Sequence, residues 1–160
     1  MTRIRMLAMD VDGTLTDGRI YIGAEGEVMK AFDVKDGLGI ARFRKDGGIP
    51  VIITGRTSQI VEARARELGI EEVHQGVPDK LLCLKQTAGR YGIKPEEMAC
   101  IGDDVNDLPC MEYCAFSACP ADAAAQVKAA ADYICTAAGG RGAVRAFLEW
   151  LRTGEMSDEA

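Results

Sequence analysis

Short apolar runs and amphipathic segments alternate along most of the chain. Runs of strand length are predicted at 4–9, 50–54, 72–75, 98–101, 115–118 and 133–135. Between them, apolar residues recur every three or four positions, which predicts helices at 36–45, 58–68, 79–91, 123–131 and 143–151. This alternation indicates a three-layer, Rossmann-like α/β fold, in which a mostly parallel sheet lies between two layers of helices.

The segment that follows the first predicted strand has a different pattern. Residues 19–22 and 27–32 read as two strands, and the turn Gly23-Ala24-Glu25-Gly26 joins them. We therefore expect a small β-hairpin insertion over about 18–33. We find no internal repeat and no linker elsewhere, so residues 1–153 are predicted to form one domain. The acidic segment 154–160 is expected to be a flexible tail.

Composition narrows the classes of function. Hydrophobic residues make up 48% of the chain and charged residues 28%, which suits a globular domain with its own core. The net charge of -6 argues against nucleic acid as a partner, because a phosphate backbone attracts a basic surface. We see neither an apolar run of the ~20 residues that a membrane span needs nor a signal peptide. We therefore expect a cytoplasmic protein with no membrane partner.

The six cysteines do not predict a zinc site. No two of them form a C-x-x-C pair, and the chain has a single histidine. We interpret them as reduced thiols in or near the core, as is usual in the cytoplasm.

Three of the predicted strands end in a polar residue, namely Asp10, Thr54 and Asp103. In an open parallel sheet, ligands bind outside the carboxyl ends of the strands. These two carboxylates and one hydroxyl are therefore expected at one edge of the sheet.

The first polar motif is Asp10-Val11-Asp12-Gly13-Thr14. Two acids in such a turn can divide the work of catalysis: one attacks phosphorus, and the other transfers a proton to the leaving oxygen and later takes one from water. The alternative is an exposed acidic turn or a calcium loop, since D-x-D-G occurs in both.

Two further features suit the binding of phosphate. Thr54 and the backbone N–H groups that follow it at Gly55 can donate hydrogen bonds to a phosphate oxygen, although a threonine here can also serve as a helix cap. Lys80 begins a predicted helix, where a cation is disfavoured unless it faces a phosphate or a carboxylate. The alternative for Lys80 is a solvated surface lysine.

The last motif, Gly102-Asp103-Asp104-Val105-Asn106-Asp107, follows a predicted buried strand. Its closely spaced oxygen ligands suit Mg²⁺, and like charges at this density repel one another unless a cation offsets them. The alternative is an ordinary polar loop.

In this order, D-x-D-G-T, a strand-end threonine, a downstream lysine and G-D-D-x-x-D resemble the signature of the haloacid dehalogenase superfamily. The resemblance implies Mg²⁺-dependent phosphate-ester hydrolysis through an aspartyl-phosphate, because an aspartate stands at position 12. It also implies roles for individual residues: Asp10 as nucleophile, Asp12 as general acid and base, Thr54 and Lys80 as phosphate ligands, Asp103 with Asp10 and the Asp12 carbonyl as metal ligands, and Asp104 and Asp107 in support.

A finer resemblance covers nearly the whole chain and is to the capless 3-deoxy-D-manno-octulosonate 8-phosphate phosphatase family. The stretches that carry it are 10–18, 32–40, 54–58, 75–80 and 139–145. The resemblance implies a role in making a lipopolysaccharide precursor and a homotetramer without a cap domain. In this family, hairpins join the subunits and a glycine-rich tail reaches a neighbouring active site. Whether the glycine-rich segment 139–145 does so stays open.

Two arginines suit an acidic sugar substrate. A guanidinium of Arg56 or Arg64 can bind the carboxylate of a ulosonic acid, and the two lie near one face if a single helix includes both. Related phosphatases for nine-carbon sugars carry a glutamate at the position of Arg56. The alternative for Arg64 is a solvated helix face. Two alternative functions remain: a phosphatase for nine-carbon ulosonate phosphates or other sugar phosphates, and a non-catalytic oligomerisation or regulatory module.

Overall fold

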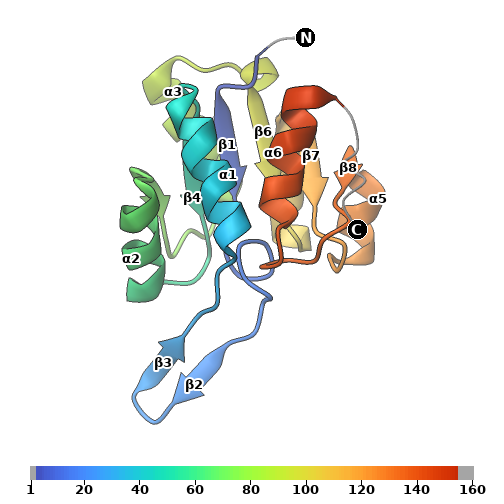
Figure 1. Ribbon diagram of the computed structural model, residues 1–160. Helices are drawn as coiled ribbons and strands as arrows, with labels where there is room; N and C mark the ends of the chain where they lie inside the picture. The colour runs from blue at the N-terminus through green and yellow to red at the C-terminus, as the bar shows by residue number, and fades with distance from the viewer. Residues whose placement is uncertain (1–2, 155–160) are drawn as a thin grey trace.

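The computed structural model describes residues 3–154 and contains a six-stranded parallel sheet (Figure 1). The strand order is β5-β4-β1-β6-β7-β8. The strands are β1 (Met6–Met9), β4 (Ile49–Ile53), β5 (Glu72–His74), β6 (Met98–Ile101), β7 (Phe116–Cys119) and β8 (Tyr133–Ile134). Each predicted strand of the sheet is present to within a few residues. The expected tail lies outside the described residues from position 155 onward.

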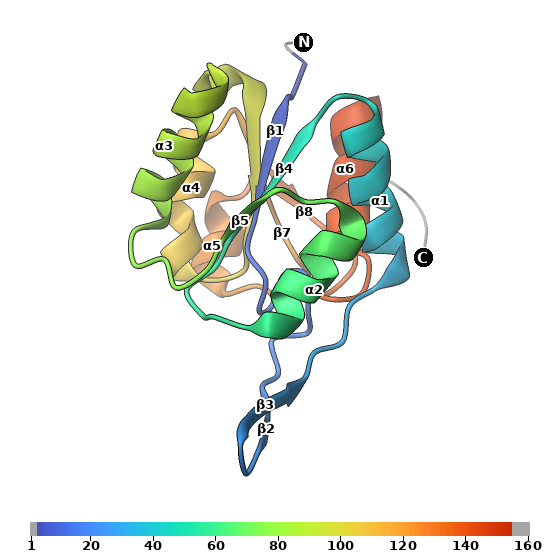
Figure 2. The same cartoon turned by 90° about the vertical axis from the view of Figure 1, so that its left-hand side faces the viewer.

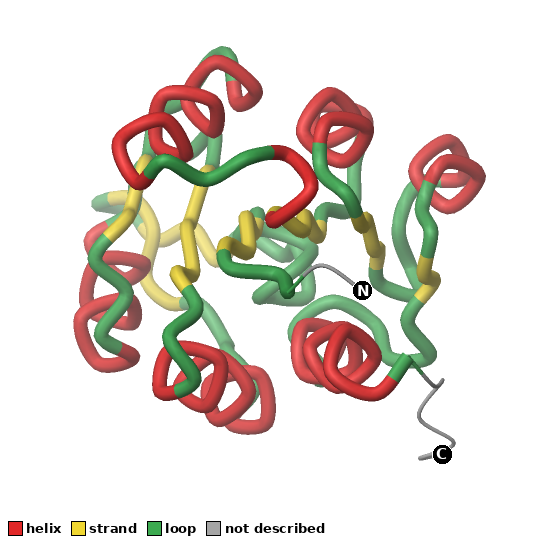
Figure 3. Tube along the Cα trace, turned by 90° about the horizontal axis from the view of Figure 1, so that it is seen from above, coloured by secondary structure: helices red, strands yellow, loops and turns green. Residues whose placement is uncertain are grey.

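In the described residues, six α-helices cover the two faces of the sheet (Figures 2 and 3). One apolar cluster packs residues of α1, α2 and α6 against the sheet, and a second packs residues of α3, α4 and α5 against its other face. The structure thus has the three layers that the alternating pattern predicts. The helices are α1 (Val34–Lys45), α2 (Gln59–Leu68), α3 (Lys80–Tyr91), α4 (Leu108–Tyr113), α5 (Ala125–Ala130) and α6 (Ala143–Thr153).

Capping residues set the ends of α2 and α3, which begin at the carboxyl edge of the sheet. Ser58 caps α2 and Asp79 caps α3, each by accepting a hydrogen bond from a backbone N–H of the first turn. Gly69 and Gly92 end these helices in the left-handed conformation.

Two of the helices differ from the prediction. The apolar spacing within 79–91 predicts that Leu82 and Leu84 both face inward, but Leu82 is 52% exposed while Leu84 is buried in the core. Helix α4 was not predicted, because its six residues are too few for a helical period and follow directly on the acidic loop. A 3-10 turn at Val105–Asp107 leads into it.

The direction in which the chain crosses the sheet changes beside β1. From β1 the chain moves outward to β4 and β5, and it then returns to β6 on the other side of β1. Met9 pairs with both Ile52 and Ile101, so the ends of the three central strands are level. Such a switch point leaves a crevice at the carboxyl edge of the sheet, and the loops after β1 and β6 both begin there.

The hairpin predicted over 18–33 is formed by β2 (Tyr21–Gly23) and β3 (Gly26–Met29). It projects from the carboxyl edge of the sheet, away from the helical layers (Figure 1). Its apolar side chains are poorly covered: Ile22 is 64% exposed and Val28 61%. Within residues 3–154, no further inserted domain covers this edge.

All six cysteines are free thiols, four of them buried. No helix in the described part of the chain combines the length and the apolar character needed to cross a membrane.

Candidate active site

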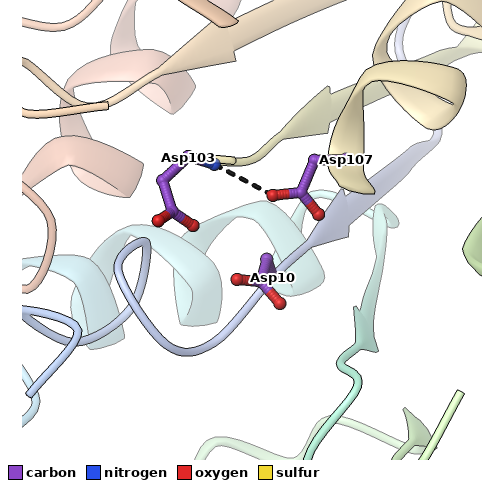
Figure 4. Close-up of side chains that lie close together, drawn as sticks. All are labelled: Asp10, Asp103 and Asp107. Carbon is purple, nitrogen blue, oxygen red and sulfur yellow. Dashed lines mark hydrogen bonds between the residues drawn. The ribbon is translucent and has the colours of Figure 1, made fainter. Parts of the chain in front are cut away.

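Three carboxylates converge at the switch point. Asp10 follows β1, Asp103 lies just beyond β6, and Asp107 ends the 3-10 turn before α4 (Figure 4). Each offers one oxygen, and the three oxygens lie within 4.8 Å of one another. The backbone N–H of Asp103 donates a hydrogen bond to Asp107 Oδ2 at 3.0 Å, which fixes the Asp107 side chain beside the other two.

Lys80 lies among these acids and is 6% exposed. Its ammonium donates hydrogen bonds to Asp10 Oδ1 at 2.8 Å and to Asp107 Oδ1 at 2.7 Å. Although burial opposes the charge, the two carboxylates raise the pKa of Lys80, so it stays protonated. The interpretation of Lys80 as a solvated surface lysine is therefore wrong. Asp79 caps the same helix and offsets the unfavourable helix dipole.

The carboxylates carry more negative charge than Lys80 neutralises. Burial, followed by the charge of Asp107, raises the pKa of Asp10 above its ordinary value. Burial and the neighbouring Asp10 raise the pKa of Asp103 to about 8. A cluster of oxygen donors with uncompensated charge fits a divalent cation such as Mg²⁺, which prefers hard oxygen ligands. The predicted ligands Asp10 and Asp103 lie in this cluster, and Asp107, which was predicted only to support the site, offers a third oxygen that could hold the cation.

Glycine is required where the catalytic loops touch. Gly13 has a φ of +97°, and a Cβ built on it would lie 2.0 Å from Asp103 Oδ2. Next to it, Thr14 Oγ1 donates a hydrogen bond to Asp103 Oδ1 at 3.1 Å. The turn after β1 therefore packs directly on the metal-ligand candidate from β6.

The glycine-rich segment that begins at Gly139 packs on the same turn from the other side. A Cβ on Gly139 would lie 1.9 Å from the Gly13 carbonyl oxygen, and the Gly140 N–H donates to the Thr14 carbonyl at 3.0 Å. These two glycines thus contact the active-site loop of their own chain.

The remaining residues of the two phosphate and metal motifs lie at the same edge. Thr54 follows β4 and is 2% exposed, and Gly55 after it is exposed. Asp104 is exposed and its side chain accepts a hydrogen bond from the Val105 N–H at 2.7 Å, so it caps the 3-10 turn that carries Asp107.

Asp12 lies beside a charged group that the sequence pattern did not reveal. Lys30, just after β3, places its ammonium 2.5 Å from Asp12 Oδ1 and 3.1 Å from Glu27 Oε2. Arg56 extends over the same group, with Nε 3.9 Å from Asp12 Oδ2 and an η nitrogen 3.7 Å from Glu27 Oε2. Glu27 and Lys30 were missed because charged residues in a hairpin ordinarily face solvent. The only signal was that this hairpin directly follows the D-x-D loop.

Arg64 does not share a helix with Arg56, because α2 begins at Gln59. The Arg64 guanidinium lies 5.6 Å from the centre of the Phe32 ring and donates a hydrogen bond to the Asp33 carbonyl at 3.4 Å. It thereby contacts the segment between the hairpin and α1. The interpretation of Arg64 as a fully solvated residue is wrong, since its side chain is 18% exposed.

The fold and this cluster of side chains are those of a haloacid dehalogenase-like hydrolase. A family model of that description matches residues 70–147. The 3-deoxy-D-manno-octulosonate 8-phosphate phosphatase KdsC of Escherichia coli (strain K12) is 46% identical over 149 residues, covering 92% of this chain and 79% of the relative.

Solved structures agree. The phosphatase of the same name from Moraxella catarrhalis, in complex with magnesium ion, phosphate ion and a KDO molecule, is 43% identical with a TM-score of 0.91, covering 95% of this chain and 87% of that one. The cobalt-bound phosphatase from Haemophilus influenzae is 36% identical with a TM-score of 0.90, covering 93% and 87%. The chain belongs to the 3-deoxy-D-manno-octulosonate 8-phosphate phosphatase family, and the predicted fold class is confirmed.

Proposed function

We propose that the protein is a Mg²⁺-dependent phosphoric monoester hydrolase that converts 3-deoxy-D-manno-octulosonate 8-phosphate to the free sugar acid, a lipopolysaccharide precursor, and phosphate. The observation that carries this proposal is the buried cluster of Asp10, Asp103, Asp107 and Lys80 at the sheet switch point. The Moraxella catarrhalis relative, which holds magnesium, phosphate and KDO, supports the metal and the substrate class.

The side chains divide the reaction between them. Mg²⁺, when bound, offsets negative charge so that a phosphate dianion can approach a carboxylate. Lys80 holds Asp10 by a 2.8 Å hydrogen bond and adds a fixed positive charge where the phosphoryl group arrives. Asp10 attacks phosphorus in line with the leaving oxygen, and the P–O bond to the sugar breaks as the aspartyl-phosphate forms.

Asp12 completes both half-reactions. It donates a proton to the departing sugar alkoxide, and it then takes a proton from the water that cleaves the aspartyl-phosphate and regenerates Asp10. Thr54, at the end of the adjacent strand, donates a hydrogen bond to the phosphoryl oxygens. Asp10 and Asp103, with the Asp12 carbonyl oxygen, would hold the metal, and Asp107 would support the site beside them. Asp104 keeps the turn that carries Asp107 in place.

Recognition of the sugar carboxylate falls to Arg56. Its side chain is 49% exposed and lies within 3.9 Å of Asp12, so a ligand at the acid/base residue is within its reach. A guanidinium binds a carboxylate with two parallel hydrogen bonds. Arg64, held against Phe32, would act through the surface next to the hairpin rather than in the pocket of its own chain.

The substrate test compares kcat/KM for the eight-carbon and nine-carbon ulosonate phosphates with magnesium present. We expect a preference for the eight-carbon ester of at least about tenfold, the size that one or two added contacts supply. Equal values would contradict the substrate assignment but leave the phosphatase assignment intact. Absence of phosphate release from these esters and from p-nitrophenyl phosphate would instead favour the non-catalytic module.

We also propose a homotetramer in which the hairpins of neighbouring subunits pack together and close the active site. The exposed Ile22 and Val28 support this, because an isolated two-stranded hairpin with apolar surface is marginal in water. Residues 1–153 would act as a single phosphatase domain in that assembly. The six free thiols support a cytoplasmic location, where cysteines stay reduced.

A further inference from the structure

Lys30 is the most completely buried charged side chain of the hairpin. It lies one residue beyond β3, and its side chain is 1% exposed. Its ammonium contacts Asp12 Oδ1 at 2.5 Å and Glu27 Oε2 at 3.1 Å. A lysine on an isolated hairpin would ordinarily extend into solvent, so its burial against the loop after β1 needs a reason.

Glu27 fixes Lys30 from the opposite side. Its Oε1 accepts a hydrogen bond from Ser58 Oγ at 2.5 Å, and its Oε2 lies 3.7 Å from Arg56. Because Ser58 also caps α2, Glu27 connects the hairpin to the first turn of that helix. Lys30 is thereby held between a carboxylate anchored to α2 and the carboxylate of Asp12.

The burial of Lys30 decides whether it binds the substrate directly or acts through another residue. A residue that binds substrate directly must present its charged end to the pocket, and at 1% exposure Lys30 does not. A buried ammonium is stable only when carboxylates compensate it, and here one of the two is Asp12. Any effect of Lys30 on the reaction therefore passes through the position of the Asp12 side chain.

We propose that Lys30 is a positioning residue that holds the Asp12 carboxylate for proton transfer, so that the hairpin contributes to catalysis in its own chain. This inference rests on the proposed role of Asp12. Without Lys30, the Asp12 side chain is free to rotate, and the leaving alkoxide loses a well-placed proton donor. A reaction whose leaving group needs no proton should not suffer in the same way.

The experiment compares two esters in single turnovers of the full-length protein with magnesium. The leaving group of 3-deoxy-D-manno-octulosonate 8-phosphate is an alkoxide that must be protonated, whereas p-nitrophenolate leaves readily without a proton. For Lys30→Met we expect cleavage of the sugar phosphate to slow by about 10²-fold, as for loss of acid catalysis. Release of p-nitrophenol in the first turnover should change by less than about threefold, and so should KM.

Three further variants test whether the effect of Lys30 on the rate passes through Asp12. Lys30→Arg keeps the positive charge and should recover most of the lost rate. Asp12→Asn should give the same selective loss, and Lys30→Met added to it should cause no further loss, because coupled residues do not act additively. Lys45→Met, at an exposed position at the end of α1, is the matched control and should leave both rates unchanged.

Equal slowing of both esters, or a further loss in the Asp12→Asn background, would overturn the inference and make Lys30 an anchor for the hairpin alone. An unchanged Lys30→Met variant would overturn it as well. If Lys30→Met fails to fold, Glu27→Gln takes its place and is judged on the two esters by the same criteria, with Lys30→Arg as the variant that should keep both rates. A wild-type protein that cleaves neither ester would contradict the proposed function itself.

Discussion

The catalytic edge and the hairpin lie side by side in the structure. They differ in how many of their side chains find partners within the same chain. At the edge, each charged side chain of the cluster has a partner: Lys80 bridges Asp10 and Asp107, and Asp103 is held by Thr14. On the hairpin, Lys30 and Glu27 tie one side of β3 to the rest of the chain. The apolar side chains of Ile22, which pairs with Glu27, and of Val28 stay exposed.

This difference suggests a division of labour: one chain supplies the reacting groups, and the assembly that we propose encloses the substrate. A single chain supplies the groups to which we assign the attack on the phosphoryl group and its stabilisation, since all of them follow adjacent parallel strands. In the proposed tetramer, the cover of the site comes from the apolar surface of neighbouring subunits. Changes at the edge should therefore alter the reaction within an intact assembly, and changes at the hairpin tip should alter the assembly first.

The largest effect is expected at the edge, from Asp10→Asn. An amide is a poor nucleophile, so turnover should fall by more than about 10³-fold while the fold and the subunit mass stay unchanged. Phosphate release, circular dichroism and light scattering measure these three quantities. Asp46→Asn, at an exposed aspartate that ends α1, is the matched control. Substantial turnover by Asp10→Asn would rule out Asp10 as the nucleophile.

A change of intermediate size is expected at the hairpin. Replacing Ile22 and Val28 together by glutamate puts charges on the surface that we assign to the subunit contact, and a buried unpaired charge disrupts such a contact. Light scattering should show a species smaller than the tetramer, and kcat/KM for the sugar phosphate should fall with it. Leu82→Glu, at an exposed leucine of α3, is the control and should keep the wild-type mass. A fully active monomer would contradict the proposed closure of the site.

The smallest effect concerns Asp36, a buried carboxylate in the first turn of α1 that receives backbone hydrogen bonds. It accepts from the Arg145 N–H at 2.8 Å and from the Gly142 N–H at 3.3 Å. Burial raises the pKa of Asp36 to about 6 from the ordinary 3.8. The folded state therefore binds this proton more tightly than the unfolded state does. The stabilisation is fully present below about pH 4 and is lost as the pH rises through 6.

The linked free energy is at most about 3 kcal/mol, since one pKa unit corresponds to about 1.4 kcal/mol. Urea unfolding of wild type and Asp36→Asn at pH 4.5 and 7.5 measures it. As the pH rises from 4.5 to 7.5, the free energy of unfolding should fall more in the wild type than in the variant. Parallel losses in the two proteins would show that Asp36 does not titrate in this range. Asp36 differs in this respect from Asp10 and Asp107 at the catalytic edge, each of which has an ion pair with Lys80.

Local patterns predicted the strands, most helices and the strand-end residues, because these depend on short-range periodicity and on the ends of strands. Asp10 and Asp103 could be placed at one edge from the parallel topology alone. The burial of Lys80 was open to two interpretations, since it depends on Asp107, 27 positions away. The roles of Lys30 and Glu27 were not visible, because the angle at which the hairpin leaves the sheet is set by tertiary contacts. Helix α4 was missed because it is too short for a periodic signal.

The contact of Gly139 and Gly140 with the loop after β1 has a consequence for how the protein becomes active during synthesis. More than a hundred residues separate the two segments, so the support for the loop leaves the ribosome long after Asp10 and Asp12 do. The nascent chain can form its central strands early, but the loop after β1 gains its contact with these glycines only once Gly139 and Gly140 have been synthesised.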